Sequence, residues 1–186
     1  MARVPDIPVD HLTPEQKRIH GEIAGPRQGT VRGPFAIWLR QPEIADKANQ
    51  FGNALRVNGK LDKRLFELMV LIVARHWSSQ LEWQQHAPAA LKGGLAPAVI
   101  EAIRDGRRPG FAHPDEEAVY DYCIELQEKR SVGDDNYRRA HEHLGTDGIE
   151  AFRFDILDAT GRIVWQSASI RKFDVSRSGR IVIPAS

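Results

Sequence analysis

The sequence has a single cysteine, Cys123, among its 186 residues. An intrachain disulfide is therefore excluded, and so is any CxxC redox or zinc motif. The longest apolar run, residues 68–74, is far too short to span a bilayer, and residues 1–10 lack the apolar core of a signal peptide. The formal net charge of +1 gives no general attraction to nucleic acid or anionic membranes. These absences predict a cytoplasmic protein without a nucleic-acid or membrane partner.

What the chain does contain is an ordinary globular composition with helical patterning. Hydrophobic residues make up 41% and charged residues 27%, enough for one domain with a core. Thr13, Pro14 and Gln16 together form a helix-start signal, in which Thr13 and Gln16 make a capping box. Residues 63–74 are apolar on nearly every side, which indicates a central, buried helix. We therefore predict an all-α fold, almost wholly helical from Thr13 to Gly145.

Proline, glycine and capping residues divide this region into segments. The expected helices and helical turns include residues 14–24, 35–39, 42–55, 63–74 and 115–130. Ser78 or Ser79 should cap a helix that stops at Gly93-Gly94, Pro97 should start one that ends by Gly106, and Asp134 or Asp135 should cap one that ends near Gly145. An irregular N-terminal arm (residues 1–12) should precede a helical domain (residues 13–157). A basic tail (residues 158–186) should follow, in which Ile163, Val164 and Trp165 favour extended structure.

Three polar residues on the two central helices form the candidate chemical site. Glu67 lies within the most apolar segment, where a carboxylate must be paired or have its pKa raised by burial. Glu82 and His86 are four residues apart and share a helix face. Ser79 lies on that face as well, three residues before Glu82. A carboxylate that orients an imidazole, with a hydroxyl nearby, is a plausible acid/base cluster.

Structural readings of the same residues remain open. Ser79 and Glu82 also match a capping box, which is the better reading for Ser79. Glu82 and His86 match an ordinary surface pair, and Glu67 matches a structural carboxylate held by Arg75 or Arg40. Two further side chains, Cys123 and Trp83, are typical of core or pocket-wall positions.

The order and spacing of several motifs resemble the carboxymuconolactone decarboxylase family over residues 11–149. These motifs are Gly33-Pro34-Phe35, Leu39-Arg40-x-Pro42-Glu43, Arg64-Leu65-x-Glu67-Leu68, Val73-Ala74-Arg75, Glu82-Trp83-x-x-His86 and Gly106-Arg107-Arg108-Pro109. The resemblance implies an AhpD-like helical bundle with a central antiparallel helix pair. It also implies a homo-oligomer, a trimer or hexamer, that acts on a small-molecule substrate.

In the peroxidase branch of this family the motif is a glutamate, a CxxC pair and a histidine. The glutamate matches Glu67 and the histidine matches His86, but Ser79 and Glu82 occupy the cysteine positions. Neither can form a disulfide or a sulfenic acid, so the thiol mechanism is unavailable there. The resemblance then implies the decarboxylase branch, which is a lyase without a cofactor or metal, acting on a small carboxylated lactone from aromatic breakdown.

On this reading His86 is the acid/base group, Glu82 orients it, and Glu67 relays or holds a proton. The substrate carboxylate would bind Arg75 or Arg40, with Ser79 nearby. Trp83 completes the residues assigned to substrate binding. Two alternatives stay open, namely an alkylhydroperoxidase-type oxidoreductase that uses Cys123 and a non-catalytic, oligomeric small-molecule binder. From residue 158 onward the chain departs from the family pattern, which either a divergent tail or an altered reading frame would produce.

Overall fold

The computed structural model describes residues 4–25, 29–58 and 61–160, and this part of the chain is helical without a strand. The all-α prediction is confirmed. The elements are the 3₁₀ turn η1 (Val9–His11) and the helices α1 (Pro14–Ala24), α2 (Pro34–Trp38), α3 (Pro42–Asn58), α4 (Lys63–His76), α5 (Gln80–Lys92), α6 (Pro97–Arg104), α7 (Pro114–Lys129) and α8 (Asp134–Thr160). In the described residues every helix is too short or too polar to span a lipid bilayer.

Local sequence signals explain where these helices begin. The Thr13 hydroxyl accepts a hydrogen bond from the Gln16 backbone N–H, and the Gln16 side chain accepts one from the Thr13 N–H, so the predicted capping box is present. The Asp62 carboxylate accepts a hydrogen bond from the Arg64 N–H at the start of α4. Proline occupies the first turn of α1, α2, α6 and α7, where its missing N–H leaves no unpaired donor.

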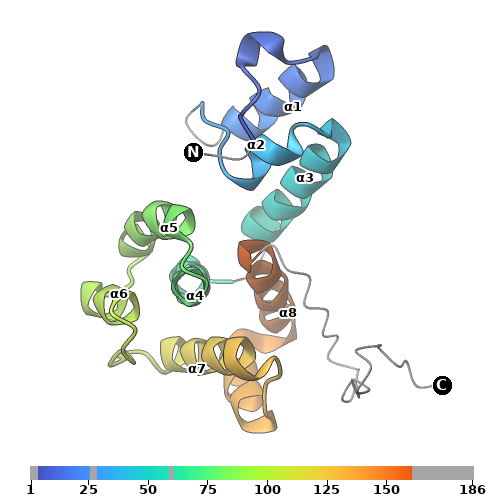
Figure 1. Ribbon diagram of the computed structural model, residues 1–186. Helices are drawn as coiled ribbons and strands as arrows, with labels where there is room; N and C mark the ends of the chain where they lie inside the picture. Colours follow the sequence, from blue (N-terminus) through green and yellow to red (C-terminus); the bar gives the residue numbers. More distant parts are fainter. Residues whose placement is uncertain (1–3, 26–28, 59–60, 161–186) are drawn as a thin grey trace, which may run out of the picture.

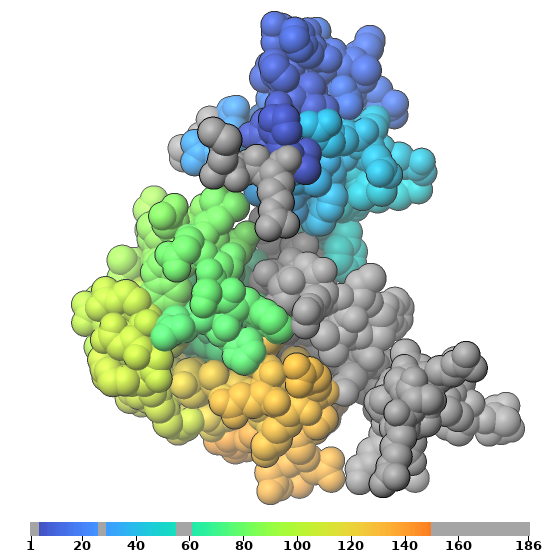
Figure 2. Space-filling model, viewed as in Figure 1, coloured from blue at the N-terminus to red at the C-terminus, as the bar shows by residue number. Residues whose placement is uncertain are grey.

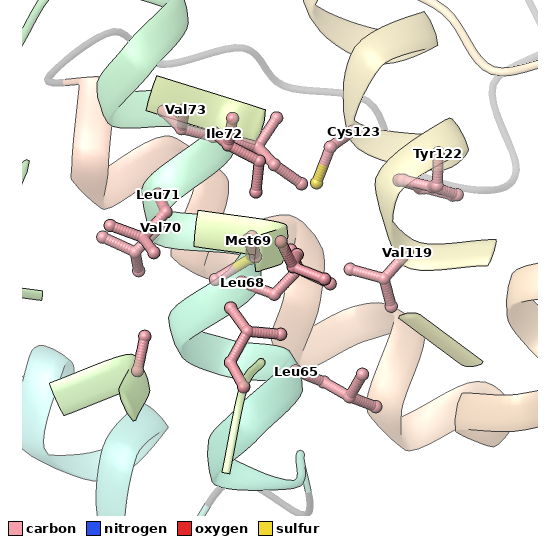
Figure 3. Packing of buried hydrophobic residues seen from close by; sticks show 14 of the residues in the cluster. Leu65, Leu68, Met69, Val70, Leu71, Ile72, Val73, Val119, Tyr122 and Cys123 are labelled. Carbon is pink, nitrogen blue, oxygen red and sulfur yellow. The ribbon is translucent and has the colours of Figure 1, made fainter. Parts of the chain in front are cut away.

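Helix α4 is the centre of the fold. Figure 1 shows it end-on, with α5, α6, α7 and α8 arranged around it. Its residues 67–74 are all buried, which confirms the prediction that residues 63–74 form the most buried helix. Figure 3 shows how Leu65, Leu68 and Ile72 of this helix face Val119 and Cys123 of α7 across the core. A helix that is apolar on all sides is stable only when neighbours cover every side, and here they do.

Helices α1, α2 and α3 form a second, smaller cluster beside this bundle (Figure 1). Its core includes Leu12, Ile19 and Ile23, and α3 contacts α8 of the bundle. The N-terminal arm is therefore less irregular than predicted, since η1 forms within it and Leu12 is buried. Leu12 was assigned to the arm, one residue before the predicted helical domain, but its buried side chain belongs to the core of this cluster.

The C-terminal end of the helical region also differs from the prediction. Gly145 interrupts α8 with φ 64° and ψ 179°, close to where we expected the last helix to end. A helical segment then resumes and runs to Thr160, past the boundary predicted at residue 158. Residues 150–157 carry the helix on, because nothing in that stretch is a proline or glycine. The predicted extended tail, residues 161–186, lies outside the described residues.

Candidate active site

The site lies between α4 and α5, which are joined by a short turn and pack against each other. Ser78 in this turn adopts a left-handed backbone conformation, with φ 54°. After this turn α5 packs against α4, so that a residue in the first half of α4 meets one in the middle of α5. Glu67 and His86 are the two residues that meet in this way.

The three predicted polar residues are brought together. His86 Nδ1 lies 2.7 Å from Glu67 Oε2, and His86 Nε2 lies 3.4 Å from Glu82 Oε2. The exposed fraction of the side chain is 7% for Glu67, 19% for His86 and 24% for Glu82. The imidazole therefore bridges a buried carboxylate on one side and a partly exposed one on the other.

This geometry exchanges the positions that we expected for the two glutamates. The short contact with Glu67 orients the ring, because Nδ1–H donates to a carboxylate that is itself buried. Glu82 instead faces Nε2, the nitrogen that points away from the core. The structure thus puts Glu67 in the position of an orienting group and Glu82 beside the proton that a ligand would meet.

The electrostatics of His86 follow from the same contacts. Burial by itself would lower the pKa of the imidazole, since it disfavours the charged form. The carboxylates of Glu67 and Glu82 outweigh burial and raise the pKa of His86 to about 9. At neutral pH the ring is an imidazolium that donates from both nitrogens, so in a reaction it would begin as the general acid.

This raised pKa predicts a pH dependence of stability. Below pH 6.5 His86 is protonated in both states and its contribution is fully present; as the pH rises toward 9, only the folded state keeps the proton. The free energy of unfolding should therefore fall by about 3 kcal/mol over this range. Urea unfolding of wild type and His86→Gln between pH 6 and 10 measures it. An equal pH dependence in both proteins would contradict the assignment.

Apolar side chains surround the cluster. The Phe66 ring lies 6.2 Å from the imidazole, measured between ring centroids. Trp83, three residues before His86 on α5, is partly buried against the main core, as are Phe66 and Ala87. These groups lower the local dielectric and strengthen the electrostatic contacts of His86. Trp83 therefore stays near the site, whereas Phe66 was not predicted because nothing in the sequence distinguishes it from other core aromatics.

The two arginines predicted to bind a carboxylate lie elsewhere. Arg75 follows Glu67 by eight residues, about 12 Å along the helix axis, and its Nε donates to the backbone carbonyl of Arg104 at 2.8 Å. Arg40 is exposed, and its guanidinium donates to the carbonyl of Pro5 at 2.6 Å. Both guanidinium groups therefore donate to backbone carbonyls of other segments. The predicted pairing of Glu67 with Arg75 or Arg40 is thus replaced by the contact of Glu67 with His86.

Ser79 is the N-cap residue of α5, but its side chain makes no capping hydrogen bond. The capping box expected with Glu82 is therefore absent, and Glu82 is directed to His86 instead. Ser79 precedes His86 by seven residues, about 10 Å along the axis. The hydroxyl thus lies at the N-terminus of α5, well away from the imidazole.

Cys123 is fully buried in the main core, on α7. Burial raises the pKa of this thiol well above its ordinary value, which keeps it protonated and unreactive. In Figure 1 α7, which carries Cys123, and α5, which carries His86, lie on different sides of α4. This placement counts against a thiol-based mechanism. Among residues 4–25, 29–58 and 61–160, no cluster of histidine, cysteine and carboxylate side chains is arranged to hold a metal ion.

Comparison of the chain with protein-family models, with curated proteins and with solved structures finds no match.

Proposed function

We propose that the protein is a cofactor-free enzyme that transfers protons to and from a small carbonyl compound at the Glu67–His86–Glu82 cluster. One observation carries the proposal: a histidine is held at 2.7 Å by a buried glutamate, while its second nitrogen faces the partly exposed side. An orienting carboxylate, an imidazole and an accessible proton are the components of general acid catalysis. The resemblance to carboxymuconolactone decarboxylases makes a lyase acting on a lactone acid the first reaction to test.

In such a reaction the bond between the lactone ring and its carboxylate breaks. Carbon dioxide leaves, and the electron pair of that bond stays on the lactone and is shared with the adjacent carbon. The neighbouring carbon must then take up a proton, which His86 Nε2–H supplies. Glu67 stabilises the imidazolium before the transfer and holds the ring so that Nε2 stays directed outward. The proton returns to His86 from solvent, since the site is partly exposed.

Because Arg40 and Arg75 bind backbone carbonyls elsewhere, the substrate carboxylate would lie beside Glu82 without either of these cations. A carboxylate beside Glu82 experiences like-charge repulsion. Its departure as uncharged carbon dioxide relieves that repulsion, so the contact disfavours the bound substrate more than the transition state. A fixed cation would have the opposite effect. Decarboxylation is therefore compatible with a site in which neither Arg40 nor Arg75 takes part.

The test is a decarboxylation assay with purified protein and a set of five-membered lactone carboxylic acids, in which carbon dioxide release is measured. We expect release that persists in Cys123→Ser, because the buried thiol takes no part. Loss of activity in a folded Cys123→Ser protein would replace this mechanism with a thiol-based one. No turnover of any lactone acid would reject the lyase activity and favour a non-catalytic small-molecule binder. The expected homo-oligomer and cytoplasmic location remain predictions.

A further inference from the structure

The outward side of His86 presents a proton donor and a proton acceptor next to each other. His86 Nε2 and Glu82 Oε2 are 3.4 Å apart, beyond the usual range of an N–H···O hydrogen bond. The opposite nitrogen is held much more tightly by Glu67, at 2.7 Å. The Nε2 proton is therefore only loosely engaged by Glu82, and both groups retain exposed surface.

The spacing between this donor and acceptor is set by one element. Glu82 and His86 are one turn apart on α5, so the helix backbone fixes their separation. Glu67 fixes the remaining freedom, the rotation of the imidazole ring. In Figure 2 the green atoms of α5 lie at the molecular surface, between the blue N-terminal helices and the yellow-orange α7. The Glu82 and His86 side chains are each partly exposed, so a small molecule can reach them from solvent.

The charge of the surroundings restricts the kind of ligand. Two carboxylates flank one imidazole, so negative charge is in excess even when His86 is protonated. Arg64 lies one turn before Glu67 on α4, but its guanidinium is turned to Asp115 and Glu116 of α7. With Arg40 and Arg75 held elsewhere as well, this side of His86 favours an uncharged ligand over an anion.

We propose that the site also enolises uncharged lactones or ketones, with Glu82 as the base and His86 as the acid. The carbonyl oxygen accepts the Nε2 proton while the Glu82 carboxylate removes a proton from the adjacent carbon. The C–H electron pair forms the carbon–carbon double bond, and the carbonyl π electrons move to oxygen. An enol, a protonated Glu82 and a neutral His86 result, and reversal restores all three. The inference rests on the proposed role of His86 as proton donor.

A carbonyl oxygen and its α-carbon are separated by only two bonds, so one substrate reaches both groups at once. Glu82 becomes uncharged when it takes the proton, so without protonation by His86 the negative charge would pass to the enolate oxygen, beside the imidazolium. Transfer of the Nε2 proton to that oxygen neutralises the charge, so the substrate must be in reach of both groups. An acid and a base held on one rigid helix satisfy that requirement.

Proton exchange in heavy water tests the proposal. The probe is α-angelica lactone, an uncharged butenolide with an acidic carbon next to its carbonyl, and NMR measures loss of that proton signal. Wild-type protein should accelerate exchange over buffer, and Glu82→Gln should reduce the enzymatic rate by ~10²-fold or more. Glu101→Gln is the matched control, because Glu101 is exposed on α6, away from the site. Circular dichroism confirms that each variant is folded.

The outcomes separate this inference from the lyase proposal. Exchange that is lost in Glu82→Gln and His86→Gln but kept in Glu101→Gln supports enolisation. Equal exchange by wild type and Glu82→Gln, or none above buffer, overturns it. Carbon dioxide release from a lactone acid under the same conditions would then leave the lyase proposal standing. Exchange without any decarboxylation would reject the lyase and retain the proton-transfer role.

Discussion

Replacing His86 with glutamine is expected to lower the turnover of any substrate of this site by about 10²–10⁴-fold, the usual contribution of a general acid. Glutamine is close in size to histidine and can still donate a hydrogen bond to Glu67. It cannot carry a transferable proton, so catalysis is lost while the fold is kept. Steady-state kinetics at pH 7 measure the change, and thermal unfolding measures the fold.

A matched control separates this effect from a general loss of histidine. His143 is exposed on α8, and His143→Gln should leave turnover unchanged. Equal activity of His86→Gln and wild type would remove His86 from the mechanism.

The pH profile adds a readout that a purely structural role would not change. Because the active form of His86 is protonated, kcat/KM should fall as the pH rises through about 9. Glu67→Gln removes the charge that stabilises the imidazolium, so the same fall should begin at lower pH. An unshifted profile in Glu67→Gln would show that Glu67 does not set the pKa of His86.

The sequence predicted the all-α fold, the buried α4 and the three polar residues that the candidate site brings together. Periodicity marked α4 as buried, and a carboxylate within such a helix needs a partner nearby. The spacing of Glu82 and His86 placed both on one face of α5. Each of these inferences depends on local geometry, which sequence spacing determines well.

The roles of the arginines could not be predicted in the same way. Arg75 and Arg40 have long side chains, and each is held by a single backbone carbonyl contributed by a distant segment. Which carbonyl lies within reach depends on how α6 and the N-terminal arm pack, and that information is not local. The same limit applies to Ser79, where the contact between Glu82 and His86 replaced the capping box.

Arg64 shows a similar long-range contact with a large expected effect on stability. Its guanidinium donates to Glu116 at 2.6 Å and to Asp115 at 2.7 Å, and so joins the start of α4 to the start of α7. The exposed fraction of the Glu116 side chain is only 2%, whereas that of Asp115 is 26%. The hydrogen bonds to Asp115 and then Glu116 outweigh burial and raise the pKa of Arg64 above its ordinary value.

Arg64→Met should therefore lower the free energy of unfolding by about 3–5 kcal/mol, because it leaves the buried Glu116 carboxylate without its cation. Adding Glu116→Met to that variant should restore most of the loss, since two apolar side chains of similar volume can replace a buried pair. Urea unfolding of both variants and of wild type measures the difference. Arg138→Met is the control, because its partner Asp135 is exposed and such a pair contributes at most about 1 kcal/mol. If Arg64→Met is no more destabilising than Arg138→Met, the contact between α4 and α7 does not depend on this ion pair.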